Sequence, residues 1–162
     1  MLDRRQFMAG VATGGTVAVA GCSGIPLIGG SPEAAVEQYF TAARNADVES
    51  ANEVLHPESS QYPLEQGDLE NVGDLTVNDV NQVSAREIVE WEVEQYDGSG
   101  NEPSEEEIEQ QVGDYEERSE EIANELGVDD HTWVLVSYEQ DGEEREDPIN
   151  TVQDDGEWYI LV

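Results

Sequence analysis

The sequence contains no lysine, one cysteine and two histidines among its 162 residues. Six arginines face 39 aspartates and glutamates, so the net charge is −33. Nucleic-acid binding needs a basic surface that meets phosphates, and this composition excludes it. A single cysteine forms no internal disulfide. Two histidines and one cysteine leave no zinc ligand set, so we expect no metal and no cofactor.

The chain also lacks an apolar run long enough to cross a membrane. The weakly apolar segment 9–20 spans about 12 residues, whereas a bilayer core needs roughly 20. It follows a twin-arginine pair, Arg4 and Arg5, with Phe7 close behind, and it ends in Val-Ala-Gly-Cys at Cys22. This end resembles a lipobox, so we interpret the segment as an export signal ending in a lipid-attachment site. The alternative is a cleaved secretory signal with an accidental cysteine nearby.

These signals predict three regions in the chain. We expect a twin-arginine signal peptide over 1–21, then a lipidated Cys22 and a flexible tether over 22–31, and one α+β domain over 32–162. The expected location is the cell membrane, on its extracytoplasmic face, with membrane lipid as the partner through Cys22.

The charge after Cys22 is extreme, because four arginines against 38 acidic residues leave a net charge of −34. Such self-repulsion opposes compaction in dilute salt but is mostly screened at 1 M salt, where the Debye length is about 3 Å. The absence of lysine and the excess of acids are typical of a halophilic protein. Disorder is the alternative, and three tryptophans, six tyrosines and clear periodic patterns argue against it.

The first part of the domain has helical patterns. Ser31 can cap a helix over 32–45, and Asp47 can cap a second one over about 48–55. Residues 58–74 are predicted to be a connecting loop. Apolar residues four and three positions apart predict a long acidic helix over 104–127, which a Ser-x-x-Glu capping box begins. That helix is either a solvated amphipathic helix or a partner-binding seam.

The remaining patterns predict strands. We expect strands over 75–83, 132–138, 145–152 and 157–162, with Asp-Gly turns at 141–142 and 155–156. Residues 89–93 alternate between apolar and acidic side chains, which favours a strand. A capping box at 84–87 favours a helix there instead, and the strand is the preferred interpretation.

The order of these elements carries a family resemblance. Its residues are 35–40, 45–47 and 55–57 early in the chain, and 133–138 and 155–159 late in it. They resemble the nuclear transport factor 2-like (cystatin-like) superfamily, specifically prokaryotic, haloarchaeal-type twin-arginine lipoproteins with a domain of unknown function. The resemblance implies an α+β fold in which N-terminal helices pack on a curved, mostly antiparallel, cone-like sheet. The helix at 104–127 would be an insertion.

No catalytic motif stands out, and the function prediction depends on the expected cone. Its candidate pocket or core residues are Tyr39, Phe40, Trp91, Trp133, Tyr138 and Trp158. We expect the three tryptophans to lie on strands and to face Tyr39 and Phe40 across the core. His56 and His131 are expected to be structural or surface residues. The predicted function is a non-enzymatic module that binds a small molecule or a protein; the alternative is an isomerase- or dehydratase-like enzyme that uses the cone.

Overall fold

The computed structural model describes residues 30–70, 72–96 and 103–162. The expected signal peptide with Arg4, Arg5 and Phe7, the lipid site at Cys22 and most of the tether lie outside the described residues. The described part is α+β, as predicted. Its elements in chain order are α1 (Pro32–Arg44), α2 (Val48–Glu53), α3 (Gln66–Leu69), β1 (Leu75–Val83), α4 (Ala85–Tyr96), α5 (Glu105–Leu126), β2 (Asp130–Gln140), β3 (Glu143–Asp154) and β4 (Glu157–Leu161).

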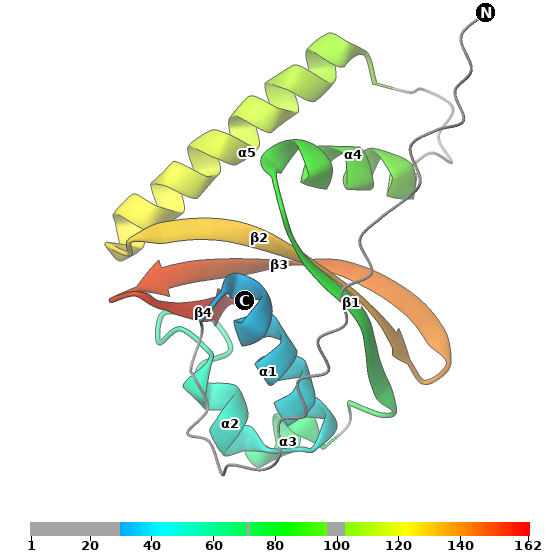
Figure 1. Cartoon of the computed structure of the whole chain (residues 1–162), viewed down its shortest axis with the longest axis vertical. Helices are drawn as coiled ribbons and strands as arrows, with labels where there is room; N and C mark the ends of the chain where they lie inside the picture. Colours follow the sequence, from blue (N-terminus) through cyan, green and yellow to red (C-terminus); the bar gives the residue numbers. More distant parts are fainter. Residues whose placement is uncertain (1–29, 71, 97–102) are drawn as a thin grey trace, which may run out of the picture.

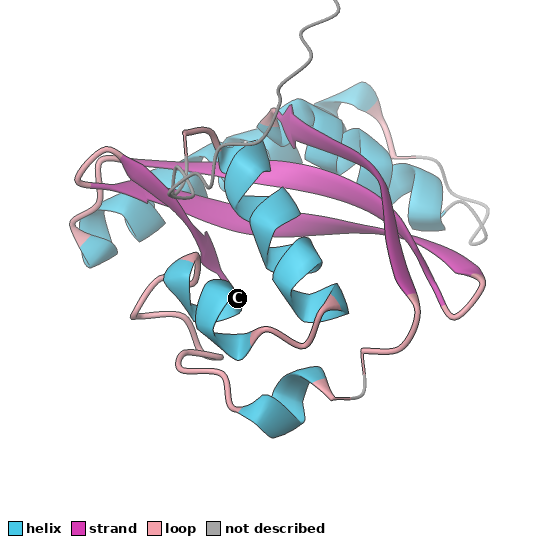
Figure 2. Ribbon diagram, turned by 60° about the horizontal axis from the view of Figure 1, so that its bottom comes forward, coloured by secondary structure: helices cyan, strands magenta, loops and turns pink. Residues whose placement is uncertain are grey.

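The four strands form one antiparallel sheet in the order β1-β2-β3-β4. Helix α1 crosses one face of this sheet, with α2 and α3 beside it, while α4 and α5 lie over the opposite face (Figures 1 and 2). The central strand β2 is therefore covered on both faces, which agrees with its nearly continuous apolar sequence. Pro148 is tolerated in β3 because β4 pairs only with Asn150–Asp154 and leaves that part of β3 unpaired on one side.

The main core lies between α1 and the sheet. Val36 and Phe40 from α1 are buried against Val134 and Val136 of β2 and Ile160 of β4. Ser31 caps α1 as predicted, because its side-chain oxygen accepts a hydrogen bond from the Ala34 amide at 3.2 Å. The first helix therefore begins where its capping residue and Pro32 place it.

The preferred strand over 89–93 is wrong, because these residues belong to helix α4. The Ser84 hydroxyl and backbone amide both donate to the Glu87 carboxylate, at 2.7 Å each, so the alternative capping-box prediction is confirmed. Ala85, Ile88 and Val89 are buried at helical spacing. Of the alternating residues Val89, Trp91 and Val93, only Val89 is buried, so the burial of the residues at helical spacing decides the conformation.

Helix α5 begins and ends as predicted, with a capping box at Ser104 and Glu107 and a left-handed Gly127 after its last turn. Its seam residues are half-buried, and none of its residues is fully buried. Val112 and Tyr115 pack against the small cluster of Ala85, Ile88 and Trp133. The solvated amphipathic helix is thus the better of the two interpretations. Two smaller differences concern α3, which lies inside the predicted loop, and α2, which ends at Glu53 before the predicted Leu55.

Candidate functional site

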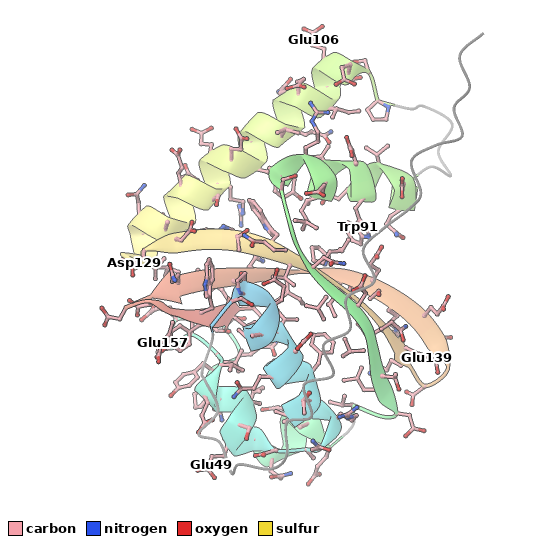
Figure 3. The ribbon with its side chains drawn as sticks, in the orientation of Figure 1. Glu49, Trp91, Glu106, Asp129, Glu139 and Glu157 are labelled. Atoms are coloured by element: carbon pink, nitrogen blue, oxygen red, sulfur yellow. The ribbon has the colours of Figure 1, made fainter. Side chains whose placement is uncertain are left out.

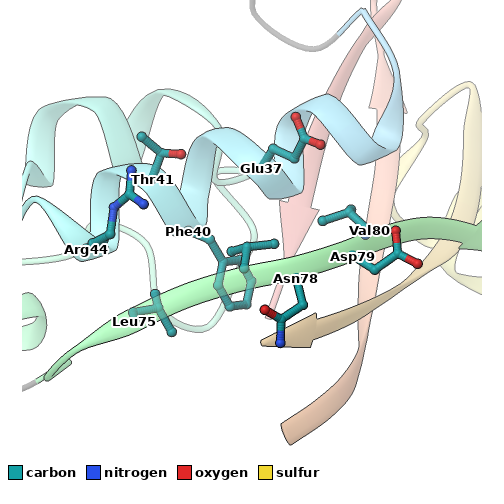
Figure 4. A pocket seen from close by; sticks show the side chains of 9 residues that line it. Glu37, Phe40, Thr41, Arg44, Leu75, Asn78, Asp79 and Val80 are labelled. Atoms are coloured by element: carbon teal, nitrogen blue, oxygen red, sulfur yellow. Dashed lines mark hydrogen bonds between the residues drawn. The ribbon is translucent and has the colours of Figure 1, made fainter. Parts of the chain in front are cut away.

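One groove is bounded by α1 and the edge strand β1, with a cavity volume of about 300 Å³. Figure 4 shows its lining from close by. The lining residues are Glu37, Phe40, Thr41 and Arg44 from α1, and Leu75, Val77, Asn78, Asp79 and Val80 from β1. Phe40 and Leu75 are buried and form an apolar floor, while the charged side chains lie at the rim.

A β-bulge shapes the strand side of the groove. The register with β2 shifts between Val77 and Asp79, so Asn78 is an extra residue in β1. The shift breaks the alternation of the strand, and Val77 and Val80 are half-buried while Asn78 and Asp79 between them are exposed. The bulge thus presents one amide and one carboxylate side chain beside the apolar floor.

The outer edge of β1 is protected by carboxylates. The Val80 amide donates to Asp79 Oδ1 at 3.1 Å, and the Gln82 amide donates to Glu33 Oε1 at 3.3 Å. The opposite edge, β4, is covered by a bridge between Leu55 and Ile160. Free strand edges invite pairing with other chains, and both edges here are partly blocked.

The groove carries charges of both signs. Arg44 lies in the last turn of α1, where a cation is favoured by the helix dipole. Glu37 and Asp79 lie toward the other end of the groove in Figure 4. A site with an apolar floor and a few polar groups at its rim is the usual form of a small-molecule site.

The predicted pocket residues are divided between the two faces of the sheet. Phe40 packs on Tyr138 at 5.2 Å between ring centroids, and Tyr39 meets Phe40 edge to face at 5.9 Å. Burial raises the pKa of Tyr39, and Asp68 raises it further. Burial and a 2.5 Å hydrogen bond to Asp147 raise the pKa of Tyr138 to about 12. Of these aromatic residues only Phe40 lines the groove.

Trp133 does not face Tyr39 and Phe40, so that prediction is wrong. Along β2 it alternates with Val134, and it therefore points to the face under α4 and α5. Its ring meets Tyr115 at 5.4 Å and His131 at 4.8 Å, edge to face in both cases. Both faces of β2 carry apolar residues, so the sequence did not indicate which face packs against α1.

Trp91 is also misplaced by the sequence, because it lies on α4 rather than on a strand. Its indole N–H donates to Glu146 Oε2 of β3 at 2.7 Å, which ties α4 to the sheet. Figure 3 shows Trp91 between α4 and the strands. Trp158 lies on a strand as predicted and is buried in β4.

Both histidines are buried and structural. His56 Nε2 lies 3.8 Å from Asp154 Oδ2, and its Nδ1 accepts from the Glu58 amide at 3.2 Å. His131 Nδ1 lies 2.8 Å from the Ser119 hydroxyl, and its Nε2 lies 3.2 Å from Asn150 Oδ1. The amide oxygen only accepts, so His131 Nε2 carries a proton and donates to Asn150, while the Ser119 hydroxyl lies within hydrogen-bond distance of both His131 Nδ1 and the His131 carbonyl oxygen. Burial lowers the pKa of His131, which favours the neutral imidazole.

The Ser119, His131 and Asn150 set has the residue types of a nucleophilic triad but not its geometry. Ser119 lies within helix α5, and its hydroxyl also reaches the His131 carbonyl oxygen at 3.2 Å. A serine nucleophile needs a hydroxyl that a substrate can reach and hydrogen-bond donors for the oxyanion. The contacts of Ser119 with His131 provide neither. The set joins α5 to β2.

A second groove lies between α4 and α5, with a cavity volume of about 360 Å³, and holds a tyrosine–carboxylate pair. The Tyr115 hydroxyl donates to Glu92 Oε1 at 2.6 Å. Burial and this bond raise the pKa of Tyr115 to about 12. A general acid or base works best with a pKa near the working pH, so this pair is suited to joining two helices rather than to proton transfer.

Three further findings bear on the site. No group of three histidine, cysteine, aspartate or glutamate side chains in the described ranges is placed to hold a metal ion. The helices in the described part of the chain are too short or too polar to cross a membrane. No family model, curated protein or solved structure matches the chain.

Most of the groove residues were not predicted from the sequence. One signal was present: Leu75 and Val77 alternate, and the next apolar residue is Val80 rather than residue 79. Such a phase change within a strand indicates a bulge, and bulges are frequent beside functional sites. No sequence signal showed that Arg44 of α1 and Asn78 of β1 line the same groove, because that depends on how the helix crosses the sheet.

Proposed function

We propose that this protein is a lipid-anchored, extracytoplasmic binding protein that takes a small molecule in the groove between α1 and β1. The single observation that carries the proposal is the groove itself. It combines the apolar floor of Phe40 and Leu75 with the side chains of Arg44, Asn78 and Asp79.

The proposal places binding at the edge of the domain rather than inside a cone. The space between α1 and the sheet is filled by buried side chains, among them Val36, Val134, Val136 and Ile160. The likeness to the nuclear transport factor 2-like superfamily belongs to this proposal. It is supported by a helix laid across an antiparallel sheet, and within it the groove would be the side opening of the cone.

The anchor is part of the same proposal. Cys22 precedes the first described residue by eight positions, and the segment between them is rich in glycine and proline. That composition and length suit a tether between a lipid on Cys22 and the domain. The route through the membrane would use Arg4 and Arg5, as in other twin-arginine signals.

Fractionation of cells tests the anchor. Cys22→Ser is expected to release the protein from membranes or stall its processing, and replacing Arg4 and Arg5 with lysine is expected to block export. A Cys22→Ser protein that is processed and still membrane-bound would contradict the anchor.

A screen for ligands tests the binding site. Thermal unfolding of the full chain would be followed in molar KCl against amino acids, peptides, sugars, carboxylates and amines. Thr41→Trp places a large ring in the groove from an exposed position on α1 and is expected to abolish any shift. The matched control is Glu49→Trp, an exposed position on α2 outside the groove. A ligand that stabilises both variants as well as the parent would show that it binds elsewhere.

A further inference from the structure

We propose that the groove between α1 and β1 binds a short linear peptide of three residues with free ends. Its amino group lies toward Glu37 and Asp79, and its carboxylate lies toward Arg44. This inference rests on the proposed binding function and names the class of ligand.

Charge separation along the groove is the first argument. In Figure 4, Arg44 lies at one end of the lining and Glu37 and Asp79 at the other. Two of the four described arginines, Arg86 and Arg145, each meet a carboxylate within 4 Å, and Arg118 on α5 lies on the other side of the sheet. Within the described residues Arg44 has no such partner, although the chain is rich in acids. A carboxylate ligand fits this unpaired guanidinium, which binds carboxylates in a two-pronged arrangement.

The length of the groove is the second argument. Glu37, Thr41 and Arg44 are four and three residues apart, so they share one face of α1. Glu37 and Arg44 are seven positions apart, which separates them along the helix by about 10 Å at 1.5 Å per residue. An extended peptide of three residues also spans about 10 Å, at 3.3–3.6 Å per residue. A free amino acid is too short to bring its ammonium and its carboxylate to both ends.

The walls of the groove suit a peptide chain. Phe40, Leu75, Val77 and Val80 offer apolar contact to small side chains. The Asn78 amide at the bulge can donate to and accept from a peptide group. Asp79 is held in place for an ammonium, because its Oδ2 accepts from the Asn81 side chain at 2.9 Å and its Oδ1 from the Val80 amide.

Other ligand classes fit the groove less well. A nucleotide or a dicarboxylate would place negative charge against Glu37 and Asp79, and a diamine would place positive charge against Arg44. A long peptide added as a strand needs free amides on β1, and those of Val80 and Gln82 already donate to carboxylates. A ligand without net charge also avoids repulsion by the acidic surface.

The test compares free and capped peptides by NMR titration of the full chain in molar KCl. The probes are tri-alanine, N-acetyl-tri-alanine, tri-alanine amide and alanine, with succinate and putrescine for the other classes. Tri-alanine is expected to bind about tenfold more tightly than either capped form, because each cap removes one charged contact. Alanine is expected to bind more weakly than tri-alanine by at least the same factor.

Two variants assign the ends of the peptide. Arg44→Gln is expected to abolish the preference for the free carboxylate while keeping the preference for the free amine. Glu37→Gln is expected to reduce only the preference for the free amine, since Asp79 remains. Arg145→Gln, an exposed arginine on β3 outside the groove, is the control and leaves all the affinities unchanged.

The outcomes separate this inference from the function on which it rests. Capped peptides that bind as well as tri-alanine, or an Arg44→Gln variant with an unchanged preference, would overturn the peptide orientation. If succinate, putrescine or another class binds instead and Thr41→Trp blocks it, the peptide class is wrong and the binding function stands. If the parent binds none of these probes and nothing in the wider screen, both proposals fail.

Discussion

At the scale of single residues, the aromatic side chains differ sharply in how much of the fold depends on them. Trp133 is 7% exposed and meets both Tyr115 and His131, so it joins β2 to α5. Trp91 is only half-buried, and its main fixed contact is the hydrogen bond to Glu146. A large buried ring stabilises the folded state because its apolar surface is removed from water and packs closely against its neighbours. A half-exposed ring contributes much less.

We therefore expect Trp133→Ala to lower the free energy of unfolding by about 3–5 kcal/mol. Trp91→Ala, the same substitution on a half-buried ring, is expected to cost about 1–2 kcal/mol, mainly the loss of one charge-assisted hydrogen bond and part of the ring burial. Denaturant unfolding in molar KCl measures both. Equal costs for the two variants would contradict the arrangement of α4 and α5 over β2.

His131 gives a pH dependence whose direction follows from its burial. Its folded pKa lies below the unfolded value of about 6.5, so the unfolded state binds the proton first as the pH falls. The contribution to stability is intact above about pH 6.5 and is lost as the pH falls from there through the lower folded pKa.

The measurement is the free energy of unfolding of the parent and of His131→Gln between pH 7.5 and 5, at roughly constant salt. The parent is expected to lose stability more steeply than the variant below about pH 6.5. All other ionisable groups are common to both proteins, so the difference between the two curves reports on residue 131. Parallel curves would mean that His131 takes up its proton equally well in the folded state.

At the scale of elements, α5 is a long helix that packs on the domain along one half-buried seam. Substitutions on its exposed side can raise the stability of the fold. Gly113 lies in its middle, is exposed, and an added Cβ would meet no atom within 4 Å. Gly73, in the turn before β1, is different. Its φ is +75°, and an added Cβ would lie 2.5 Å from Asp141 Oδ1.

The same substitution is therefore expected to have opposite effects at the two glycines. Gly113→Ala should raise the free energy of unfolding by about 0.5–1 kcal/mol, because alanine favours the helix. Gly73→Ala should lower it by about 1 kcal/mol or more, because the left-handed backbone and the Asp141 contact both oppose a side chain. Thermal unfolding of the two variants measures both effects. A stabilised Gly73→Ala would contradict the close approach of the two turns.

At the scale of the whole molecule, the dominant feature is the acidic surface. The labelled side chains Glu49, Glu106, Asp129, Glu139 and Glu157 point away from the body of the molecule in Figure 3. They are exposed, and they come from every part of the described chain. The carboxylates thus repel one another across a small domain wherever salt does not screen them.

We expect the chain without its signal to unfold or expand below about 0.5 M salt, where the Debye length exceeds about 4 Å. Circular dichroism against KCl concentration measures the transition. The control is the same titration near pH 4, where about half of ordinary carboxyls are protonated and low salt should be tolerated better. A fully folded signal at about 10 mM KCl and neutral pH would show that the repulsion does not limit the fold.

The sequence alone determined the features that depend on local physical chemistry. Ser31, Ser104 and Gly127 marked helix ends through hydrogen bonds within a few residues. The two Asp-Gly turns joined β2, β3 and β4 in the predicted order, since a tight turn leaves adjacent strands no other pairing. The coarse α+β class followed from these signals.

Tertiary structure decided what local signals left open. Residues 85–96 carry both a strand-like alternation and a capping box, and they are helical because Ala85 and Ile88 are buried together with Trp133 of β2. Trp133 points away from α1 and packs against α4. Strand β1 leads directly into α4, which lies on the face of the sheet opposite α1. The groove exists because α1 lies beside the bulge at Asn78, a placement set by contacts across the core that no short stretch of sequence contains.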